Sequence, residues 1–554
     1  MDALSPDGEA EAFTHALFDA VVGKARLAAV LLAGGSALLF RFRRQAASTV
    51  VERAAAGFRY AAAAARRGGT ALERDRFGAW TLAALTAAGA LLRIRWLGQP
   101  INYDESFTYI TYVSRPAVIG LSDYGYLNNH LLNTLLAHAS TSILGNAPWA
   151  LRLPAFAAGC ALIPLAYALA RRLADPPAGL LAAAIVAASP VLMEFSACAR
   201  GYSLATAAFL AIALIACDLI ERDDEGGWTW LAGIAALGFF AVPVFAYPFG
   251  VVLLWILLAR LQDRRSIPDA LREGAAAVAT TGALVAALYA APLGVSGVPE
   301  RWQFTAPPEP FVRFAASLGE TVRTVWADLL RGIPPGGTAA LVGAAAVAAA
   351  GGARGRVGLL AASAIMVSVA AVLAQGIVAP ARAWLFLLAT LLILAAIGGS
   401  AAIRAVRGGL AGSNRVADSL AAAIAGAAVV AAVVAWQPPL FDETSEPEER
   451  MIKLDSEAIA LFLGAELEPG DAVVSAFPLD YPIEYYVRRH RLPFTLLAPP
   501  SASASRYLVV ANDGLGQTID RVLARGAVPA RPSAPVLLRR FTYSSVYEMS
   551  AAAP

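Results

Sequence analysis

Long apolar runs recur along almost the whole chain and constrain its fold more than any other feature. An α-helix needs about 20 mostly apolar residues to cross a hydrocarbon core. Runs close to that length predict membrane spans at 78–97, 149–170, 178–195, 201–220, 228–245, 247–261, 274–292, 337–352, 357–378, 382–401 and 418–436. A shorter run at 26–40 adds an N-terminal candidate. We therefore predict a polytopic α-helical membrane protein with 11–12 transmembrane helices.

The composition agrees with a membrane protein. Of the 554 residues, 58% are hydrophobic and 15% are charged, whereas soluble globular domains carry roughly 25% charged residues. The net charge of +3 is spread along the chain and gives no sign of nucleic-acid binding. The three cysteines, Cys160, Cys198 and Cys217, form no CxxC or zinc-type spacing, which argues against a disulfide framework or a zinc site.

The arginines predict the orientation of the spans, because cytoplasmic loops carry an excess of basic residues. One set of alternate loops contains Arg171, Arg172, Arg222, Arg260, Arg264, Arg265, Arg272, Arg354, Arg356, Arg404, Arg407 and Arg415. The short turns of the other set contain only Arg200 and Arg382. The first set is therefore expected to be cytoplasmic, which places segments 98–148, 293–336 and 437–554 outside.

Three regions follow from these patterns. Residues 1–77 form an N-terminal extension with the extra span and an amphipathic helix over 45–76. Residues 78–436 form the transmembrane domain, whose outer loop 98–148 is expected to carry two surface helices, at 104–113 and 129–144.

Residues 437–554 are expected to form a small soluble α/β domain, because short β-rich runs alternate there with helical stretches. The expected strands are 472–476, 507–511, 536–541 and 544–549, and the expected helices are 453–466, 482–489 and 516–525.

Asp104 and Glu105 are the first candidates for chemistry, because they follow a span directly. Placing a charge near hydrocarbon costs free energy, so carboxylates found there are expected to have a function. The two side chains point about 100° apart on a helix and need not act as one pair. The alternative is purely structural, since acidic residues at a helix N-terminus interact favourably with its dipole.

Asn129 and His130 precede the second surface helix. They either cap that helix and fill its interface, or they bind a phosphate or a cation in the outer cavity. Arg152, Arg200 and Arg382 lie at the outer ends of spans. Each could extend toward lipid head groups, but three arginines beside an acidic pair favour an anionic lipid ligand, because a guanidinium binds phosphate through two hydrogen bonds.

Five segments together resemble a known family. They are Tyr103-Asp104-Glu105-Ser106, Asn129-His130-Leu131, Arg152-Leu153-Pro154, Ala199-Arg200-Gly201-Tyr202-Ser203-Leu204 and Pro380-Ala381-Arg382-Ala383-Trp384. Over roughly residues 78–400 the chain resembles the polytopic GT-C glycosyltransferases, especially bacterial relatives of protein O-mannosyltransferases and of the aminoarabinose transferase that acts on lipid A. Members often have His-Pro-Pro-Leu-Tyr where this chain has Asn129-His130-Leu131-Leu132-Asn133, and Arg-Tyr where it has Arg382-Ala383-Trp384.

The resemblance implies an inverting glycosyltransferase that uses a polyprenyl-phosphate sugar donor. Asp104 would be the catalytic base, with Glu105 assisting it, and Arg200, Arg382 and Arg152 would stabilise the departing phosphate. Asn129, His130 and Tyr202 would complete substrate binding. A divalent cation, if used, would be held by Asp104, Glu105 and His130.

The resemblance also implies partners and a location. The acceptor would be a hydroxyl of an envelope glycan, lipid or protein. The site would face the periplasm from a bacterial inner membrane, among membrane lipids. Two alternatives stay open. A lipid transporter or flippase would favour polar groups at mid-membrane, whereas here the unusual polar residues lie at the outer ends. A polysaccharide polymerase or ligase would share the outer site.

Overall fold

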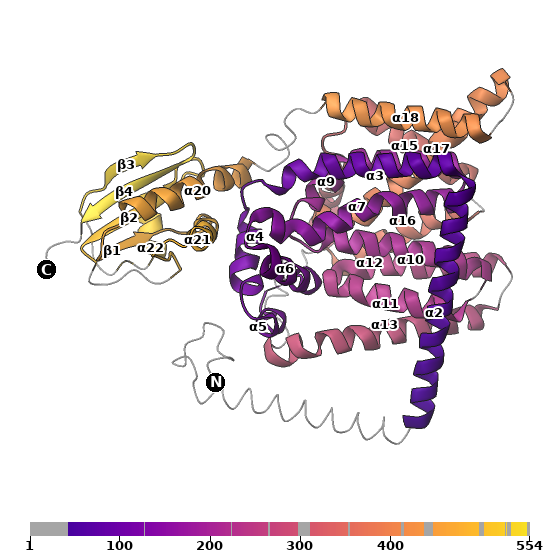
Figure 1. Ribbon diagram of the computed structural model, residues 1–554, viewed down its shortest axis with the longest axis horizontal. Helices are drawn as coiled ribbons and strands as arrows, with labels where there is room; N and C mark the ends of the chain where they lie inside the picture. The colour runs from indigo at the N-terminus through magenta and orange to yellow at the C-terminus, as the bar shows by residue number, and fades with distance from the viewer. Residues whose placement is uncertain are drawn as a thin grey trace. The chain divides into compact units, whose positions relative to one another are not determined.

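The computed structural model describes residues 43–126, 128–222, 224–263, 266–296, 311–352, 355–411, 415–436, 447–497, 504–526, 528 and 533–550. The expected span at 26–40 lies outside these residues. The chain divides into two compact units. We call Met1–Ile94, Leu121–Asn133 and Pro154–Gln437 the membrane unit, and Arg95–Gly120, Thr134–Leu153 and Pro438–Pro554 the C-terminal unit. Figure 1 labels their elements.

The membrane unit is helical, and each of the eleven spans expected after residue 78 coincides with a helix or a broken helix. Its elements are α2 (Arg43–Arg74), α3 (Arg76–Leu97), α7 (Pro148–Leu173), α8 (Pro176–Ala188), α9 (Pro190–Ser196), α10 (Tyr202–Arg222), α11 (Glu225–Ala241), η4 (Pro243–Phe245), α12 (Ala246–Gln262), α13 (Ile267–Ser296), α14 (Phe311–Leu329), α15 (Pro335–Gly351), α16 (Arg356–Gln375), η6 (Ala381–Trp384), α17 (Leu385–Ala411) and α18 (Arg415–Trp436). The last residues of α3 and the first of α7 belong to the C-terminal unit.

Length and composition make seven described helices candidates for crossing a membrane, or eight if the bent pair α8–α9 is one span. The protein is therefore a multi-pass membrane protein, as predicted. The count is lower than the number of expected spans because some helices are short: α11 and α15 have 17 residues each, below the roughly 20 that an untilted span needs.

Helix α2 is the amphipathic helix expected near 45–76, and it runs crosswise at one end of the bundle (Figure 1). Its inner face is fixed by polar contacts. Asp218 of α10 accepts hydrogen bonds from Tyr60 Oη at 3.0 Å and Arg67 Nη2 at 2.8 Å, and Trp230 Nε1 of α11 donates to the Gly57 carbonyl at 2.9 Å. Helix α2 is thus attached to α10 and α11.

Segment 293–336 contains a helix that the sequence analysis did not predict. Residues Phe311–Leu329 form α14. Phe314 and Leu329 on one face of α14 are buried, whereas Arg313 and Arg323 on another face are exposed. The helical spacing of these apolar residues was present in the sequence but was overlooked.

The C-terminal unit combines short helices with a sheet. Its elements are α4 (Tyr103–Thr108), the π-helix η3 (Tyr109–Val113), α5 (Ala117–Ser122), most of α6 (Leu131–Leu144), α20 (Pro447–Glu466), β1 (Asp471–Val474), α21 (Asp480–Arg489), β2 (Arg506–Asn512), α22 (Ile519–Arg525), β3 (Val536–Arg540) and β4 (Ser544–Ser550). The small C-terminal sheet region and its helices agree with the expected α/β pattern.

The four strands are ordered β1-β2-β4-β3. β1 pairs with β2 in parallel, and the other two pairings are antiparallel. The parallel pair requires a crossover, which α21 lies within. Tyr507 and Val509 of β2 are fully buried in the core of the sheet. Residues 95–120 and 134–153, which we expected to belong with the transmembrane domain, group with these C-terminal residues instead.

Candidate active site

The acidic pair lies in the first turn of α4, within the C-terminal unit. Asn102 caps this helix: its Oδ1 accepts a hydrogen bond from the Glu105 N–H at 2.8 Å, and Glu105 Oε2 accepts one from the Asn102 N–H at 3.3 Å. This is a capping box, which satisfies two backbone donors reciprocally. Glu105 is 1% exposed, whereas Asp104 is half-buried. The two carboxylates therefore occupy different environments.

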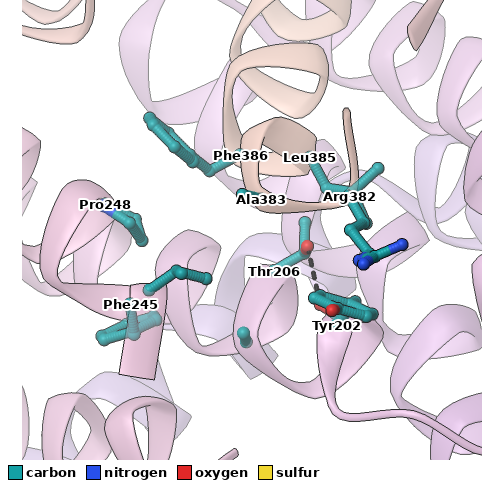
Figure 2. Close-up of a pocket in the computed structure, with 10 residues that line it drawn as sticks. Tyr202, Thr206, Phe245, Pro248, Arg382, Ala383, Leu385 and Phe386 are labelled. Atoms are coloured by element: carbon teal, nitrogen blue, oxygen red, sulfur yellow. Dashed lines mark hydrogen bonds between the residues drawn. The ribbon is translucent and has the colours of Figure 1, made fainter. Parts of the chain in front are cut away.

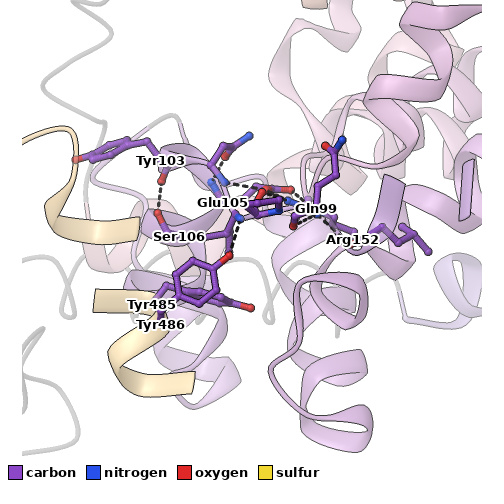
Figure 3. Close-up of polar contacts among 12 residues, drawn as sticks. Gln99, Tyr103, Glu105, Ser106, Arg152, Tyr485 and Tyr486 are labelled. Atoms are coloured by element: carbon purple, nitrogen blue, oxygen red, sulfur yellow. Dashed lines mark hydrogen bonds and ion pairs between the residues drawn. The ribbon is translucent and has the colours of Figure 1, made fainter. Parts of the chain in front are cut away.

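Arg152 forms a buried ion pair with Glu105 (Figure 3). Its Nε donates to Glu105 Oε1 at 2.8 Å and its Nη2 to Glu105 Oε2 at 2.5 Å. The remaining bonds go to backbone carbonyls: Nη1 donates to Leu97 O at 2.9 Å and Gln99 O at 2.7 Å, and Nη2 to Pro100 O at 3.1 Å. A guanidinium has five N–H donors, and all five are used here.

This arrangement bears on the predicted role of Arg152. We expected Arg152 to bind phosphate, but its donors are occupied by Glu105 and by the loop that leads into α4. The geometry instead favours a positioning role, in which Arg152 and Glu105 hold the loop before Asp104.

Helix α21 contacts the same loop. Tyr486 Oη accepts a hydrogen bond from the Ile101 N–H at 3.1 Å, as Figure 3 shows. Burial is the main cause that raises the pKa of Tyr486, which keeps the hydroxyl neutral. The Tyr103 ring lies 4.9 Å from that of Phe477 and 5.6 Å from that of Tyr481, both at edge-to-face angles. The C-terminal residues therefore support the helix that carries Asp104.

His130 lies in the membrane unit, just before α6, and is 4% exposed. Its Nδ1 accepts a hydrogen bond from the Gly201 N–H at 2.7 Å. A backbone N–H can only donate, so Nδ1 is unprotonated and the neutral ring carries its proton on Nε2. Burial, followed by the positive charges of Arg200 and Arg382, holds the pKa of His130 well below its ordinary value. The ring is therefore neutral near pH 7.

Arg200 lies beside His130 in the turn between α9 and α10. It donates to Asn128 Oδ1, its Nη2 is 3.5 Å from His130 Nε2, and its guanidinium carbon lies 5.7 Å from the centre of the Tyr202 ring. Asn133 Nδ2 fixes the turn by donating to Ala199 O at 2.9 Å. Asn129 supports the preceding loop, since its Nδ2 donates to Asp123 O at 2.7 Å.

Gly201 allows the α9–α10 turn to lie close to His130 and to the end of α11. A Cβ at this position would lie 2.4 Å from Ala241 O and 3.1 Å from His130 Nδ1. Since carbon and oxygen atoms do not approach to 2.4 Å, any side chain would push the turn away from α11 or from His130.

Arg382 lies on η6 at the edge of a pocket of about 270 Å³, which includes space open to solvent. Tyr202 and Thr206 of α10 add polar groups to the pocket (Figure 2). The remaining lining is apolar and comes from Ala205, Val244, Phe245, Pro248, Ala383, Leu385 and Phe386. Stacking of Trp384 on Tyr247, with ring centres 5.1 Å apart, anchors η6 beside the pocket.

The three predicted metal ligands do not fit a metal site. Both oxygens of Glu105 accept bonds from Arg152, and His130 Nε2 carries a proton in the neutral ring. Within the described residues, no group of three or more His, Cys, Asp or Glu side chains could hold a metal ion. No cofactor is established.

The structure thus assembles two groups of predicted residues, each within one unit. Asp104, Glu105 and Arg152 belong to the C-terminal unit, and Asn129, His130, Arg200, Tyr202 and Arg382 to the membrane unit. Sequence reasoning missed Arg93, a fully buried arginine of α3. Two sequence features could have pointed to it. An arginine inside an apolar run needs partners for its charge, and the Ser189-Pro190 break inside another run leaves a carbonyl without its usual N–H donor.

Comparisons with known proteins find a family model that matches part of the chain and solved structures with a similar fold. Residues 131–291 match the model of the dolichyl-phosphate-mannose-protein mannosyltransferase family. The apo structure of ArnT from Cupriavidus metallidurans aligns with a TM-score of 0.50 and 15% identity, over 84% of this chain and 97% of that one. The oligosaccharyltransferase of Archaeoglobus fulgidus, tethered to an acceptor peptide, aligns with a TM-score of 0.50 and 11% identity, over 86% and 74%.

No curated protein sequence matches this chain. At these identities the structural alignments establish the shared fold, and the family model adds the enzyme class. Together they confirm the resemblance to the GT-C membrane glycosyltransferases, whose fold this chain shares.

Proposed function

We propose that this protein transfers a sugar from a polyprenyl-phosphate donor to a hydroxyl of an acceptor in the cell envelope. The observation that carries the proposal is an apolar pocket with Arg382 at its edge, together with Arg200 and His130, which both contact the pocket residue Tyr202. A polyprenyl phosphate has an apolar chain and an anionic head, and it matches both parts of this surface.

The head group would be held by His130, Arg200 and Arg382. In the neutral ring His130 Nε2–H is a donor, and Arg200 Nη2, itself a donor, lies 3.5 Å away. Two converging donors are satisfied when both donate to one acceptor, and a phosphate oxygen is the strongest such acceptor in this chemistry. Because His130 is neutral, it adds a hydrogen bond without adding charge to that of the arginines.

The lipid chain would follow the apolar lining. Phe245, Leu385 and Phe386 line the pocket beside Arg382, and apolar surface of this kind favours a hydrocarbon chain over water. The matched family, whose description names dolichyl-phosphate-mannose, supports a lipid-phosphate sugar as the donor class.

Asp104 would be the general base. It would take the proton of the acceptor hydroxyl while that oxygen attacks the anomeric carbon. The bond from this carbon to the phosphate oxygen breaks, polyprenyl phosphate leaves, and the anomeric configuration inverts. Asp104 is better suited than Glu105, whose two oxygens are already bonded to Arg152.

We further propose that the site faces the periplasm of a bacterial inner membrane. The support is the arginine bias of the loops, which makes the set containing Arg171 and Arg172 cytoplasmic. Arg200 and Arg382 then lie on the outer side, as does the helix that carries Asp104.

The test is transfer of radiolabelled sugar from polyprenyl-phosphate donors by purified protein, with Asp104→Asn beside the wild type. We expect donor-dependent release of polyprenyl phosphate, and a loss of about 10²–10⁴-fold in kcat for the variant with unchanged donor binding. Full activity of Asp104→Asn would refute the assignment of the base. Lipid binding without turnover of any donor would favour a lipid transporter instead.

A further inference from the structure

Arg93 is a buried cation inside a membrane-spanning helix. It lies in α3, and its side chain is 0% exposed. A guanidinium stays protonated in proteins, and charged side chains within spans are rare and tend to mark functional regions. Among the described residues, none of the hydrogen-bond acceptors of Arg93 is a carboxylate, so its charge must be compensated in another way.

Backbone carbonyls and one hydroxyl provide that compensation. Nη1 donates to Gly89 O at 2.9 Å and Ala187 O at 3.0 Å. Nη2 donates to Val186 O at 3.1 Å and Nε to Ser196 Oγ at 3.2 Å. Three of these four acceptors belong to α8 and α9, which form one broken helix.

The break in that helix explains why its carbonyls are available. α8 ends at Ala188, α9 begins at Pro190, and the two axes are bent by 63°. In a continuous helix the Val186 carbonyl would accept from the N–H of residue 190, but proline has none. The last carbonyls of a helix also carry partial negative charge. Arg93 therefore supplies both the missing donor and a matching positive charge.

The contact to Ser196 connects this arrangement to the candidate active site. Ser196 is the last residue of α9, and the turn that follows it carries Arg200 and Gly201. Ser196 Oγ also donates to Leu192 O at 2.5 Å. A Cβ on Gly159 of α7 would lie 1.9 Å from Ser196 Oγ, so α7 packs directly against this hydroxyl and leaves it no room to shift.

The far side of the turn is fixed as well. Ser203 Oγ donates to Phe195 O at 2.8 Å, and the Gly201 N–H donates to His130 Nδ1. A displacement of the C-terminal end of α9 would therefore move Arg200 relative to His130.

We propose that Arg93 is a positioning residue for the lipid-phosphate site: by bonding both halves of the broken helix α8–α9 it sets the place of Arg200. This inference depends on the proposed function to the extent that Arg200 binds the donor phosphate. Arg93 itself touches no substrate in this proposal and acts through the α9–α10 turn.

The experiment measures binding of undecaprenyl phosphate to purified protein in lipid nanodiscs, together with the apparent Tm. Arg93→Met removes all four bonds and should raise the Kd by about tenfold, because small misplacements of binding groups cost affinity steeply. Arg93→Lys keeps the charge and should recover part of the affinity. Ser196→Ala removes the Nε acceptor and the bond from Ser196 Oγ to Leu192 O but leaves the other three bonds of Arg93. It should show a smaller loss, so the proposal stays testable if Arg93→Met does not fold.

Arg260→Met is the matched control. Arg260 is another buried arginine, 2% exposed, that donates to Leu219 O at 3.1 Å and pairs with Glu273. Its loss should lower the apparent Tm but leave the Kd unchanged. An equal rise in Kd for Arg260→Met would show that the loss of any buried arginine weakens undecaprenyl phosphate binding, and would overturn the proposal.

A double-mutant cycle with Arg200→Ala separates the inference about Arg93 from the proposal that Arg200 binds the donor phosphate. If Arg93 acts through Arg200, Arg93→Met should weaken binding no further once Arg200 is removed. Independent, additive losses would overturn the inference, and so would wild-type affinity in folded Arg93→Met or Ser196→Ala. Wild-type affinity in Arg200→Ala would instead refute the phosphate site itself, and is thereby distinguished from a failure of Arg93.

Discussion

Glu105 and Arg152 form a two-point ion pair in which the side chains are only 1% and 3% exposed. Breaking a buried pair leaves an uncompensated charge and costs about 3–5 kcal/mol. Glu105→Ala and Arg152→Met should each lower the apparent Tm strongly, and for the same reason. Thermal unfolding followed by tryptophan fluorescence would measure this.

The double variant Glu105→Ala/Arg152→Met is compared with these two single variants. Because removal of both charges leaves neither one unpaired, it should be more stable than the two single losses added together predict. Strict additivity would mean that the pair does not act as one unit.

Tyr486→Phe should destabilise the loop before Asp104. The Ile101 N–H is buried and would lose its acceptor, which costs about 1–3 kcal/mol. We expect a lower apparent Tm and a reduced kcat with undecaprenyl phosphate binding unchanged, since the loop carries the proposed base and not the phosphate groups. Tyr547→Phe, at a half-buried tyrosine of β4, is the control and should be close to wild type in both measurements.

Gly201→Ala should weaken phosphate binding. The new Cβ would lie 2.4 Å from Ala241 O, and such overpacking costs about 1–3 kcal/mol while it moves Arg200 away from His130. A binding titration with undecaprenyl phosphate should show the loss. Gly233→Ala is the control, because a Cβ at Gly233, in α11, would meet nothing within 4 Å. An unchanged Kd for Gly201→Ala would contradict the described role of this turn.

His130 should make stability depend on pH. Burial and the nearby charges of Arg200 and Arg382 lower its pKa in the folded protein, whereas the unfolded ring titrates near pH ~6.5. Between these two pKa values the unfolded state binds more protons, so stability rises with pH there. The contribution is present above about pH 6.5 and is lost as the pH falls.

The measurement is the apparent Tm between about pH 7.5 and 5. Wild-type protein should lose more stability on acidification than His130→Gln, whose amide oxygen can still accept the Gly201 N–H. His138→Gln is the contrasting variant. His138 Nδ1 donates to Val113 O at 2.8 Å and takes no part in the contact with Gly201, so the pH dependence of the protein should survive the substitution.

Much of the architecture was readable from the chain. Apolar runs predicted the helices well, because membrane burial and helix packing both require apolar residues. The alternating pattern after residue 450 predicted strands such as β2. The individual site roles were harder. Arg152 was expected to bind phosphate because an arginine near an acidic pair is informative, but the carbonyls of Leu97, Gln99 and Pro100 that occupy its donors have no sequence signature.

Arg93 illustrates the same limit. Its partner carbonyl at Val186 is free because Pro190, almost a hundred residues further along the chain, lacks an N–H. Only the packing of α3 against α8 brings Arg93 to it. The tautomer of His130 likewise depends on a backbone group, the Gly201 N–H, which every residue but proline possesses. Side-chain identity predicts candidates, whereas backbone partners decide what each candidate does.

The bond between Tyr486 and Ile101 has a consequence for domain exchange. Residues 438–554 follow the last span. A simple chimera would replace them with the corresponding segment of a relative that has a different acceptor. In this fold they form one compact unit with residues 95–120 and 134–153, so a graft made at residue 438 alone would pair a foreign α21 with the resident acid-bearing loop. A working chimera would have to exchange the three stretches together.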